Sequence, residues 1–404
     1  MAKIDDSVKK KVPELRFKGF TDEWEDRKFF ESIASTIDFR GRTPKKLGMD
    51  WSESGYLALS ALNVKNGYID PLADAHYGDE NLYKKWMSGK ELKKGQVLFT
   101  TEAPMGNVAQ VPDNNGYILS QRTVAFETKE DMMTNDFLAV LLKSPLVFNN
   151  LSALSSGGTA KGVSQKSLKG LSITVPFDID EQQKIGSFFK QLDDTIALHQ
   201  RKLDLLKEQK KGYLQKMFPK NGAKVPELRF AGFADDWEER KLGDITKIST
   251  GKLDANAMVE NGKYDFYTSG IKKYRIDVAA FEGPSITIAG NGATVGYMHL
   301  ADNKFNAYQR TYVLQEFLVD RSFIFSEIGN KLPKKIKQEA RTGNIPYIVM
   351  DMLTELKVSI PQNDTEQKKI GDFFKQLDDT IALHQRKLDL LKEQKKGFLQ
   401  KMFV

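Results

Sequence analysis

The sequence contains no cysteine, and only four of its 404 residues are histidine. The absence of cysteine excludes disulfide bonds and thiolate chemistry, and it agrees with a protein of the reducing cytoplasm. The histidines stand far apart along the chain, so no two of them have the spacing of metal ligands. We therefore expect no metal site in this chain.

Long apolar runs are also missing. No stretch reaches about 18 apolar residues, which argues against a membrane-spanning helix. The first residues, Met-Ala-Lys-Ile-Asp-Asp, lack the apolar core of a secretion signal. With 40% apolar and 28% charged residues, the composition is that of a soluble globular protein. The length suggests two or three domains, and we expect a cytoplasmic location.

The chain carries a net charge of +7 and has a pI near 9.0. This charge suits a polyanionic partner, although a mildly basic soluble protein without such a partner fits it equally well. Segments 181–218 and 366–404 carry a net +3 each, so the rest of the chain is close to neutral. Any DNA affinity outside these segments must therefore come from local clusters of basic residues.

An internal repeat decides the domain organisation. Segments 181–218 and 366–403 agree at 35 of 38 positions, with an offset of 185 residues. Upstream, VPELRFKGFTDEWEDRK from Val12 returns as VPELRFAGFADDWEERK from Val225, with an offset of 213. Between these anchors the two copies differ, apart from short matches such as SQRTV from Ser120 and YQRTY from Tyr308. Each copy is thus a variable domain followed by a long segment of fixed sequence.

The fixed segments predict two long helices. Apolar residues recur at alternating spacings of four and three, which is the pattern of a helix packed along one seam. Asp180 and Thr365 stand where a helix N-cap is expected, after Pro176 and Pro361 end the preceding strands. The predicted seam residues are Ile185, Phe189, Leu192, Ile196, His199, Leu203 and Leu206 in the first helix, and Ile370, Phe374, Leu377, Ile381, His384, Leu388 and Leu391 in the second.

The two helices are expected to pair with each other in antiparallel fashion. Each would be about 57 Å long at about 1.5 Å per residue. The domain between them has a radius of gyration of roughly 14 Å. Parallel helices would require this domain to bridge the full length of a helix, whereas antiparallel helices would not. His199 and His384 should then lie near the twofold axis as polar positions that fix the register, with a pH switch as the alternative.

We therefore predict an α+β protein with a pseudo-twofold internal repeat: two α/β domains at opposite ends of an antiparallel pair of long helices. The first variable domain spans 1–176 and the first long helix 177–218. A linker at 219–224 leads to the second variable domain, 225–361, and the second long helix covers 362–404.

Two segments resemble catalytic motifs but do not match them. ITIAGNGATVG (286–296) places glycines after a probable strand, but their spacing is G-x-G-x-x-x-G rather than that of a dinucleotide fingerprint. Asn344-Ile345-Pro346-Tyr347 resembles the Asn-Pro-Pro-aromatic motif of amino methyltransferases, but isoleucine replaces the first proline. No P-loop and no plausible Ser/His/Asp set is present. We therefore expect no catalysis by this chain.

The layout resembles the specificity (S) subunit of type I restriction–modification systems, the HsdS family. The resemblance covers nearly the whole chain. It rests on the W-E-x-R-K openings at Trp24 and Trp237, on the G-R-T-P element at 41–44, and on the Glu-Gln-x-x-Ile helix starts at Glu181 and Glu366. The second domain departs from this pattern, with Ser-Thr-Gly-Lys at 249–252 in place of G-R-T-P.

The resemblance implies a DNA-binding subunit for phage defence. Each variable domain would be a target recognition domain that reads one half of a split double-stranded DNA site. The helices would set the spacer between the halves and dock two methyltransferase (modification) subunits. Those partners would use S-adenosylmethionine to methylate adenine N6, and restriction subunits would add an ATP- and Mg²⁺-dependent translocase and nuclease. No cofactor is implied for this chain.

Candidate DNA contacts are loops that combine Arg or Lys with Ser, Thr, Asn or Gln, because these side chains bind phosphates and base edges. The Arg40–Lys46 loop is the preferred candidate, whereas Lys334–Arg341 could equally be a solvated helix face. The duplicated Gln-Arg-Thr favours a role in the fold or in phosphate binding over base reading. The candidates are Arg40, Arg42, Thr43, Lys45, Lys46, Thr100, Thr101, Glu102, Ser120, Gln121, Arg122, Thr159 and Lys161 in the first domain, and Thr250, Lys252, Asn291, Thr294, Tyr308, Gln309, Arg310, Lys334, Lys335, Lys337, Arg341 and Asn344 in the second.

Two other classes of protein remain open. A structural coiled-coil adaptor would lack donor-rich loops in its variable domains, which is not what the sequence has. A self-sufficient enzyme would bind S-adenosylmethionine without a partner.

Overall fold

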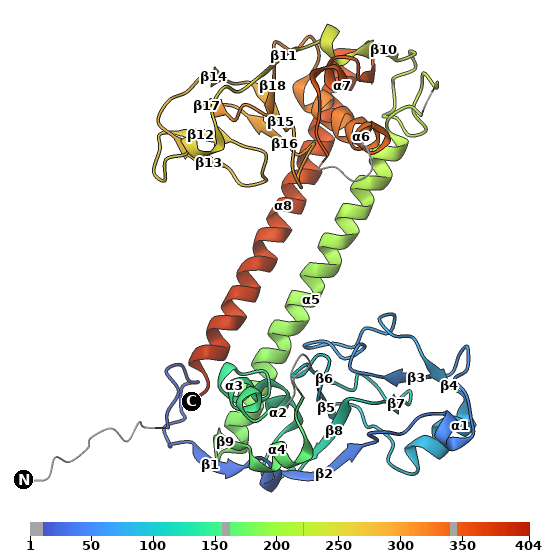
Figure 1. The fold of residues 1–404 in the computed structure, drawn as a ribbon, viewed down its shortest axis with the longest axis vertical. Helices are drawn as coiled ribbons and strands as arrows, with labels where there is room; N and C mark the ends of the chain where they lie inside the picture. Colours follow the sequence, from blue (N-terminus) through green and yellow to red (C-terminus); the bar gives the residue numbers. More distant parts are fainter. Residues whose placement is uncertain (1–10, 156–161, 221, 340–345) are drawn as a thin grey trace, which may run out of the picture. The chain divides into compact units, whose positions relative to one another are not determined.

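The structure is a computed structural model that describes residues 11–155, 162–220, 222–339 and 346–404. The chain divides into two compact units, whose elements are labelled in Figure 1. Unit 1 consists of Met1–Gln200 and Lys387–Val404, and unit 2 consists of Arg201–Arg386. Every helix of the described ranges is too short or too polar to cross a lipid bilayer.

The variable domain of unit 1 is built from small sheets with short helices. Strands β2, β8, β5 and β6 form an antiparallel sheet in that order, β3 lies between β4 and β7, and β1 pairs with β9. The strands are β1 (Glu25–Lys28), β2 (Ile33–Asp38), β3 (Tyr56–Leu59), β4 (Tyr77–Gly78), β5 (Val97–Thr100), β6 (Val108–Gln110), β7 (Ile118–Leu119), β8 (Thr123–Thr128) and β9 (Ser172–Val175). The helices are α1 (Glu80–Met87), α2 (Asn135–Leu141), α3 (Pro145–Ala153), α4 (Gln165–Gly170) and the long α5 (Ile179–Lys216).

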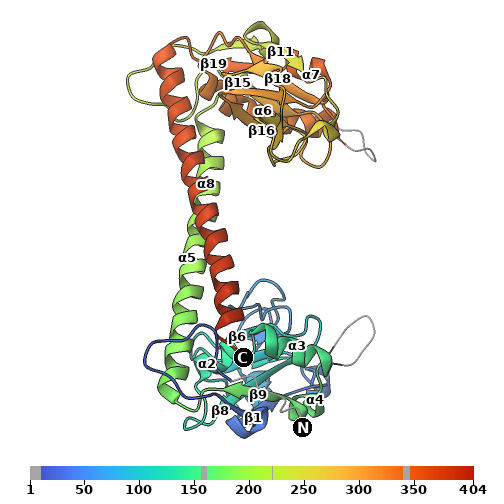
Figure 2. The same cartoon turned by 90° about the vertical axis from the view of Figure 1, so that its left-hand side faces the viewer.

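The variable domain of unit 2 repeats this plan. The antiparallel sheet β11-β18-β15-β16 corresponds to β2-β8-β5-β6, and Figure 2 shows α6 lying against it. A second sheet has the order β13-β12-β17-β14, and β10 pairs with β19. The strands are β10 (Glu238–Lys241), β11 (Lys247–Thr250), β12 (Tyr264–Tyr267), β13 (Tyr274–Ile276), β14 (Phe281–Glu282), β15 (Ser285–Ala289), β16 (Met298–Ala301), β17 (Lys304–Ala307), β18 (Thr311–Gln315) and β19 (Lys357–Ile360). The helices are α6 (Arg321–Glu339), α7 (Met350–Thr354) and the long α8 (Asp364–Lys401).

The long helices run antiparallel within each unit. In unit 1, Phe188 of α5 packs on Phe398 of α8 with ring centroids 5.1 Å apart, and Asp193, further along α5, pairs with Lys395, which stands earlier in α8. Because one residue number rises as the other falls, the two segments point in opposite directions. The residues of unit 2 that correspond by the 185-residue repeat make the same contacts: Tyr213 packs on Phe373 with centroids 5.0 Å apart, and Lys210 pairs with Asp378. The predicted α+β fold with a duplicated domain-and-helix plan is confirmed.

The heptad pattern coincides with the covered faces of both helices. Residues outside the pattern on the opposite face, such as Leu198 and Leu383, are exposed. The seam positions Ile185, Phe189, Leu203, Leu206, Ile370, Phe374, Leu388 and Leu391 are buried, and Leu192, Ile196, His199, Leu377, Ile381 and His384 are half-buried.

The N-caps of the long helices lie two residues earlier than predicted. Asp178 precedes α5, and its carboxylate accepts a hydrogen bond of 2.7 Å from the backbone N–H of Asp180. Asn363 precedes α8, and its side-chain oxygen accepts one of 2.9 Å from Thr365. Asp180 and Thr365 are therefore residues of the first helical turn rather than caps. The prediction chose the wrong one of two polar residues, because both residue types are favoured near a helix start.

A buried ion pair fixes the start of α5 in unit 1. Arg16 binds Glu181 through two parallel hydrogen bonds of 2.6 and 2.7 Å, and the Glu181 side chain is 1% exposed. The neighbouring Leu15 donates its backbone N–H to the carbonyl of Lys401 at the end of α8, at 2.9 Å. One short segment therefore joins the first turn of one long helix to the last turn of the other.

The same clamp recurs in unit 2 with the repeated residues. Arg229 binds Glu366 at 2.6 and 2.8 Å, and Leu228 donates to the carbonyl of Lys216 at 2.8 Å. The ELRF repeat noted in the sequence thus has a structural role. The repeated tryptophans add to it, since Trp24 packs on Phe403 and Trp237 on Phe218, with ring centroids 5.9 and 6.0 Å apart.

Each long helix has a glycine where its variable domain comes closest. A Cβ added at Gly186 would lie 2.8 Å from the backbone nitrogen of Phe137, and one added at Gly371 would lie 2.7 Å from that of Phe323. Both distances are too short for a methyl group. At these two positions the variable domains lie so close to α5 and α8 that only glycine fits.

We predict that Gly186→Ala lowers the stability of unit 1 by about 1–3 kcal/mol, because the new methyl group forces the α2 backbone away. Gly397→Ala is the matched control within the same unit, because a Cβ there meets nothing within 4 Å. This control should raise stability by about 0.5–1 kcal/mol, the usual gain from replacing glycine in a helix. Urea unfolding followed by circular dichroism measures both, and equal effects of the two changes would refute the close-approach argument.

Candidate nucleic-acid interface

In unit 1, two of the predicted clusters, Thr100–Glu102 and Ser120–Arg122, meet at one edge of the variable domain. Glu102, after β5, forms an isolated β-bridge with Gly162, and its side chain pairs with the guanidinium of Arg122 at 3.1 Å. Arg122 is exposed and has a φ of +64°, so the loop before β8 presents this side chain from a constrained turn. The edge is therefore a preformed surface with exposed charge.

Unit 2 builds the same edge with other side chains. Asn291, after β15, forms an isolated bridge with Tyr347, and the exposed Arg310 stands before β18 as Arg122 stands before β8. Thr294 donates its hydroxyl to the carbonyl of Ser269, and the Ser269 hydroxyl donates to the Asn291 side chain. Tyr347 is 55% exposed. The two edges thus share a backbone plan but differ in chemistry.

Sequence reasoning missed a basic loop beside this edge. Lys272 and Lys273 lie between β12 and β13, next to Ser269, and both are exposed. Lys273 lies 5.3 Å from the ring centroid of Tyr267, and burial, followed by the nearby Asp265, raises the pKa of Tyr267 to about 12. Tyrosine therefore stays neutral here and acts as a platform for the cation. The signal in the sequence was the lysine pair flanked by tyrosines.

In the Arg40–Lys46 loop, the preferred candidate of the first domain, several donor groups already bind atoms of the protein. Arg42 donates to the carbonyl of Trp86 and lies 4.3 Å above the ring of Phe39. Lys46 donates to the carbonyl of Gly41 at 2.7 Å. The half-buried Thr43 accepts from Lys46, while Arg40 lies 3.5 Å from Asp38 and is exposed. Lys45 is exposed as well.

The other candidates differ in their exposure and in their place in the fold. Thr100 and Thr101 are 0% and 2% exposed, so their side chains lie inside the fold. Ser120, Gln121, Thr250 and Tyr308 are half-buried, and Lys252 and Gln309 are exposed. Lys334, Lys335 and Lys337 belong to α6, where Lys335 pairs with Glu339 at 2.5 Å. Thr159, Lys161, Arg341 and Asn344 lie outside the described residues.

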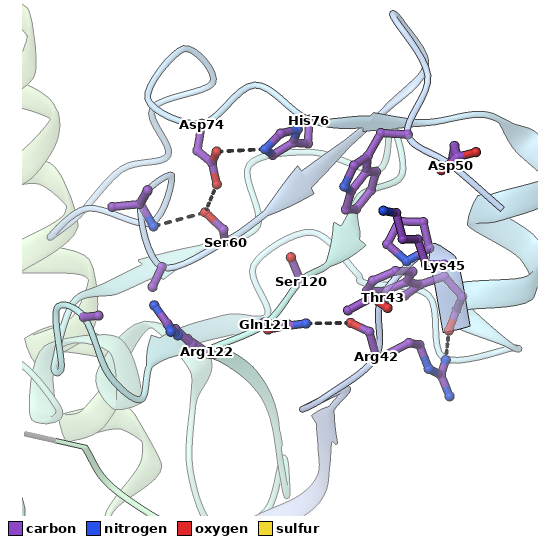
Figure 3. A pocket seen from close by; sticks show the side chains of 16 residues that line it. Arg42, Thr43, Lys45, Asp50, Ser60, Asp74, His76, Ser120, Gln121 and Arg122 are labelled. Atoms are coloured by element: carbon purple, nitrogen blue, oxygen red, sulfur yellow. Dashed lines mark hydrogen bonds and ion pairs between the residues drawn. The ribbon is translucent and has the colours of Figure 1, made fainter. Parts of the chain in front are cut away.

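A pocket of about 630 Å³ opens in unit 1 between the predicted loops (Figure 3). The Nε2 amide of Gln121 donates to the carbonyl of Arg42 at 2.9 Å, which ties the loop before β8 to the Arg40–Lys46 loop. The pocket is lined by Arg42, Thr43, Pro44, Lys45, Asp50, Trp51, Ser60, Ala61, Leu62, Asp74, His76, Trp86, Ala103, Ser120, Gln121 and Arg122.

The polar groups of this pocket do not form a catalytic set. Ser60 donates its hydroxyl to Asp74 at 2.7 Å, and Asp74 lies 3.1 Å from Nε2 of His76. A serine nucleophile needs its hydroxyl on the imidazole, whereas here it is on the carboxylate. Among residues 11–155, 162–220, 222–339 and 346–404, no three His, Asp or Glu side chains are grouped to hold a metal ion. The arrangement suits binding rather than chemistry.

The fold and the duplicated edges define a protein with two related but unlike recognition domains on a common pair of helices. A sequence profile of the type I restriction modification DNA specificity domain matches residues 22–208 and 234–393. The chain belongs to this family and is a type I specificity subunit.

Named relatives agree with this assignment. The chain is 33% identical over 167 residues to the type I restriction enzyme EcoDI specificity subunit of Escherichia coli, an alignment that covers 41% of this chain and 37% of that protein. It is 23% identical over 319 residues to the MjaVIII specificity subunit of Methanocaldococcus jannaschii, covering 70% and 72%. The crystal structure of a type I restriction-modification S subunit from M. genitalium has the same fold, with a TM-score of 0.72 and 18% identity over 97% of this chain and 99% of that one.

A buried carboxyl group in α6 gives unit 2 a dependence on pH. Glu327 is 0% exposed, its carboxylate accepts the backbone N–H of Ser359 in β19 at 2.9 Å, and Lys331 lies 3.8 Å away. Burial raises the pKa of Glu327 from 4.5 to about 7. Between these values the folded protein holds a proton that the unfolded chain has released, so stability falls as the pH rises from 4.5 to 7.

We predict that Glu327→Gln removes this dependence, because glutamine keeps the oxygen that faces Ser359 and cannot ionise. The loss of stability between pH 4.5 and 7 is on the order of 3 kcal/mol in the parent and should be nearly absent in the variant. Denaturant unfolding at a series of pH values measures it. A variant that keeps the slope of the parent would contradict the assignment to Glu327.

Proposed function

We propose that this chain is the subunit that reads DNA sequence in a type I restriction–modification complex, and that each variable domain reads one half of a bipartite, asymmetric site. One observation carries the proposal: the same edge is built twice with different side chains. Glu102, Arg122 and Gly162 in unit 1 correspond to Asn291, Arg310 and Tyr347 in unit 2. A carboxylate accepts from cytosine N4, whereas an amide pairs with adenine, so the two edges favour different bases.

The long helices would set the distance between the half-sites. Each is 38 residues long, which is about 57 Å at about 1.5 Å per residue. Half-sites of twofold binders lie about one helical turn of DNA, or 34 Å, apart. A pair of long helices of fixed sequence would therefore suit two readers that must keep a constant separation.

The helices would also dock two identical methyltransferase subunits. Leu198 and Leu390 of unit 1 are 65% and 52% exposed, and the corresponding Leu383 and Leu205 of unit 2 are 60% and 51% exposed. In unit 1, Asp193 of α5 pairs with Lys395 of α8. Leu198 stands five residues after Asp193, and Leu390 stands five residues before Lys395. Because the helices are antiparallel, the two leucines lie at the same height along the helix pair. Each unit thus has the same pair of exposed leucines, which suits a repeated apolar contact.

In such a complex the chemistry belongs to the partners. The methyltransferase subunits would bring S-adenosylmethionine and methylate adenine N6, and restriction subunits would use ATP and Mg²⁺. This chain would supply the DNA contacts without a cofactor of its own. The complex would act on double-stranded DNA in the cytoplasm.

Arg310→Ala tests the division of the target. We expect the second half-site to be weakened or relaxed and the first to stay unchanged, because Arg310 belongs to the edge of unit 2 alone. Loss of a base contact would cost about 1–3 kcal/mol at one position, whereas loss of a phosphate contact would weaken all sequences equally. Methylome sequencing of cells with the complete system reports both half-sites.

Lys241→Ala is the control for this test, because Lys241 is an exposed cation of β10 in the same unit, paired with Glu355. It should leave the methylated sequence unchanged. Equal relaxation of both half-sites by Arg310→Ala would show that the two domains do not read separate halves.

Leu198→Asp combined with Leu390→Asp tests the docking surface. We expect the purified complex to contain one methyltransferase subunit per chain instead of two, as measured by native mass spectrometry, because only the leucine pair of unit 1 is changed. Exposed substitutions of this kind usually alter stability by less than about 0.5 kcal/mol. Lys392→Asp, on the other flank of the seam in the same unit, is the control. Retention of both partners by the double variant would place the docking surface elsewhere.

A further inference from the structure

The pocket of unit 1 has aromatic walls. Trp86 is 1% exposed, and its indole N–H donates to the carbonyl of Leu119 at 2.9 Å, so this ring is fixed. Trp51 is half-buried, with its ring centroid 5.6 Å from that of Trp86 and 5.5 Å from that of His76. Trp51, held against these two rings and itself only half-buried, offers the pocket an aromatic surface for a planar ligand.

Charged groups of both signs line the same pocket (Figure 3). Asp74 is held by the Ser60 hydroxyl at 2.7 Å and by His76 at 3.1 Å, and Asp50 is exposed. Lys45 and Arg122 are exposed cations that also line the pocket. The lining therefore offers acceptors for amino groups and donors for an anion next to one aromatic wall.

This combination matches three chemical features of a nucleotide. The rings match the base, the carboxylates match its N–H groups, and the cations match the phosphate. The volume of about 630 Å³ lies within the range of roughly 300–1,000 Å³ that is usual for small-ligand sites. A base inside an intact duplex cannot enter such a pocket, because its faces are covered by the neighbouring pairs.

We propose that this pocket binds a nucleotide whose base is out of the stack, either one turned out of the first half-site or a free mononucleotide. Binding of a base extruded from DNA rests on the proposed function, whereas binding of a free mononucleotide does not. The free energy needed to extrude a base is lowest where its base pair is weak. Extrusion would therefore make recognition depend on the strength of the base pair as well as on the base edges.

The pocket belongs to the first variable domain. The chain has four tryptophans, and the two outside the pocket, Trp24 and Trp237, pack against Phe403 and Phe218. The second domain therefore has no tryptophan available for such a wall. Extrusion into this pocket is expected in the first half-site alone. The methyltransferase subunits would extrude the adenine that they methylate in either half-site, so a tolerant position reports this pocket only if it depends on Trp51.

The first experiment is a mismatch scan with the complete methyltransferase complex. Each position of the methylated target receives one mismatched pair, and binding is measured by fluorescence anisotropy. A mismatch at a pair read in the groove weakens binding about tenfold or more. At an extruded position the mismatch should leave binding unchanged or tighten it, because the pair no longer has to be opened.

The second experiment titrates the full chain with dAMP, dCMP, dGMP, TMP and deoxyribose 5-phosphate by calorimetry. Binding of a mononucleotide but not of the sugar phosphate is expected if the rings hold the base. Trp51→Leu should weaken this binding, and any binding to an extruded position, by roughly tenfold.

A second variant guards against loss of folding in Trp51→Leu. Asp50→Asn changes an exposed side chain and should weaken the nucleotides with amino groups but not TMP. Asp131→Asn, an exposed acid of the same unit that does not line the pocket, is the control and should have no effect.

The results of these experiments distinguish a base extruded from DNA from a free mononucleotide as the ligand of the pocket. A tolerant position in the first half-site that depends on Trp51 supports extrusion, and Trp51-dependent mononucleotide binding without such a position supports a free ligand. The proposal is overturned if no tolerant position of the first half-site depends on Trp51 and no mononucleotide binds, while the complex still methylates a bipartite target. If the complex recognises no bipartite target, the proposed function fails, and the mononucleotide titration alone decides the pocket.

Discussion

The buried pairs of Arg16 with Glu181 and of Arg229 with Glu366 are the contacts on which each unit depends. A carboxylate with 1% or 0% exposure in its side chain cannot stay ionised without a partner, and each has a bidentate arginine. Because the backbone beside each arginine also binds the end of the antiparallel helix, the pair fixes both the start of one long helix and its alignment with the other. Loss of either arginine would leave a buried carboxyl group without its cation at the start of a long helix.

The way in which the domains dock on the helices explains how their sequences can differ while the helices stay the same. Gln182 accepts from the backbone N–H of Thr134 and donates to the carbonyl of Met132, and Gln367 accepts from the backbone N–H of Asp320. Gly186 and Gly371 likewise face backbone atoms. Since these contacts are made to the main chain, they constrain its path without fixing the side chains of the variable domains.

The sequence predicted those parts of the fold that repeat. The 185-residue offset and the heptad spacing were enough for the two long helices, because local periodicity reports helix packing directly. Their antiparallel sense followed from the size of the domain between them. The pocket between Trp51 and Trp86 could not be predicted, since its walls come from segments that only the sheet topology brings together. Arg42 illustrates the same limit: its residue type suits DNA, yet its guanidinium is held by a carbonyl that lies 44 residues away in the chain.

The common helices and the different edges separate two requirements that a single surface could not meet. A partner that binds twice needs identical surfaces, and Leu198 with Leu390 repeats as Leu383 with Leu205. A reader of an asymmetric sequence needs different surfaces, and Asn291 stands where unit 1 has Glu102. Because Gln182, Gln367, Gly186 and Gly371 contact the main chain of the variable domains, a change of side chain at an edge of a variable domain need not disturb the helix surface. If the helices dock the partners and the edges read DNA, as proposed, the division between fixed helix and variable loop would let the recognised sequence change while assembly is preserved.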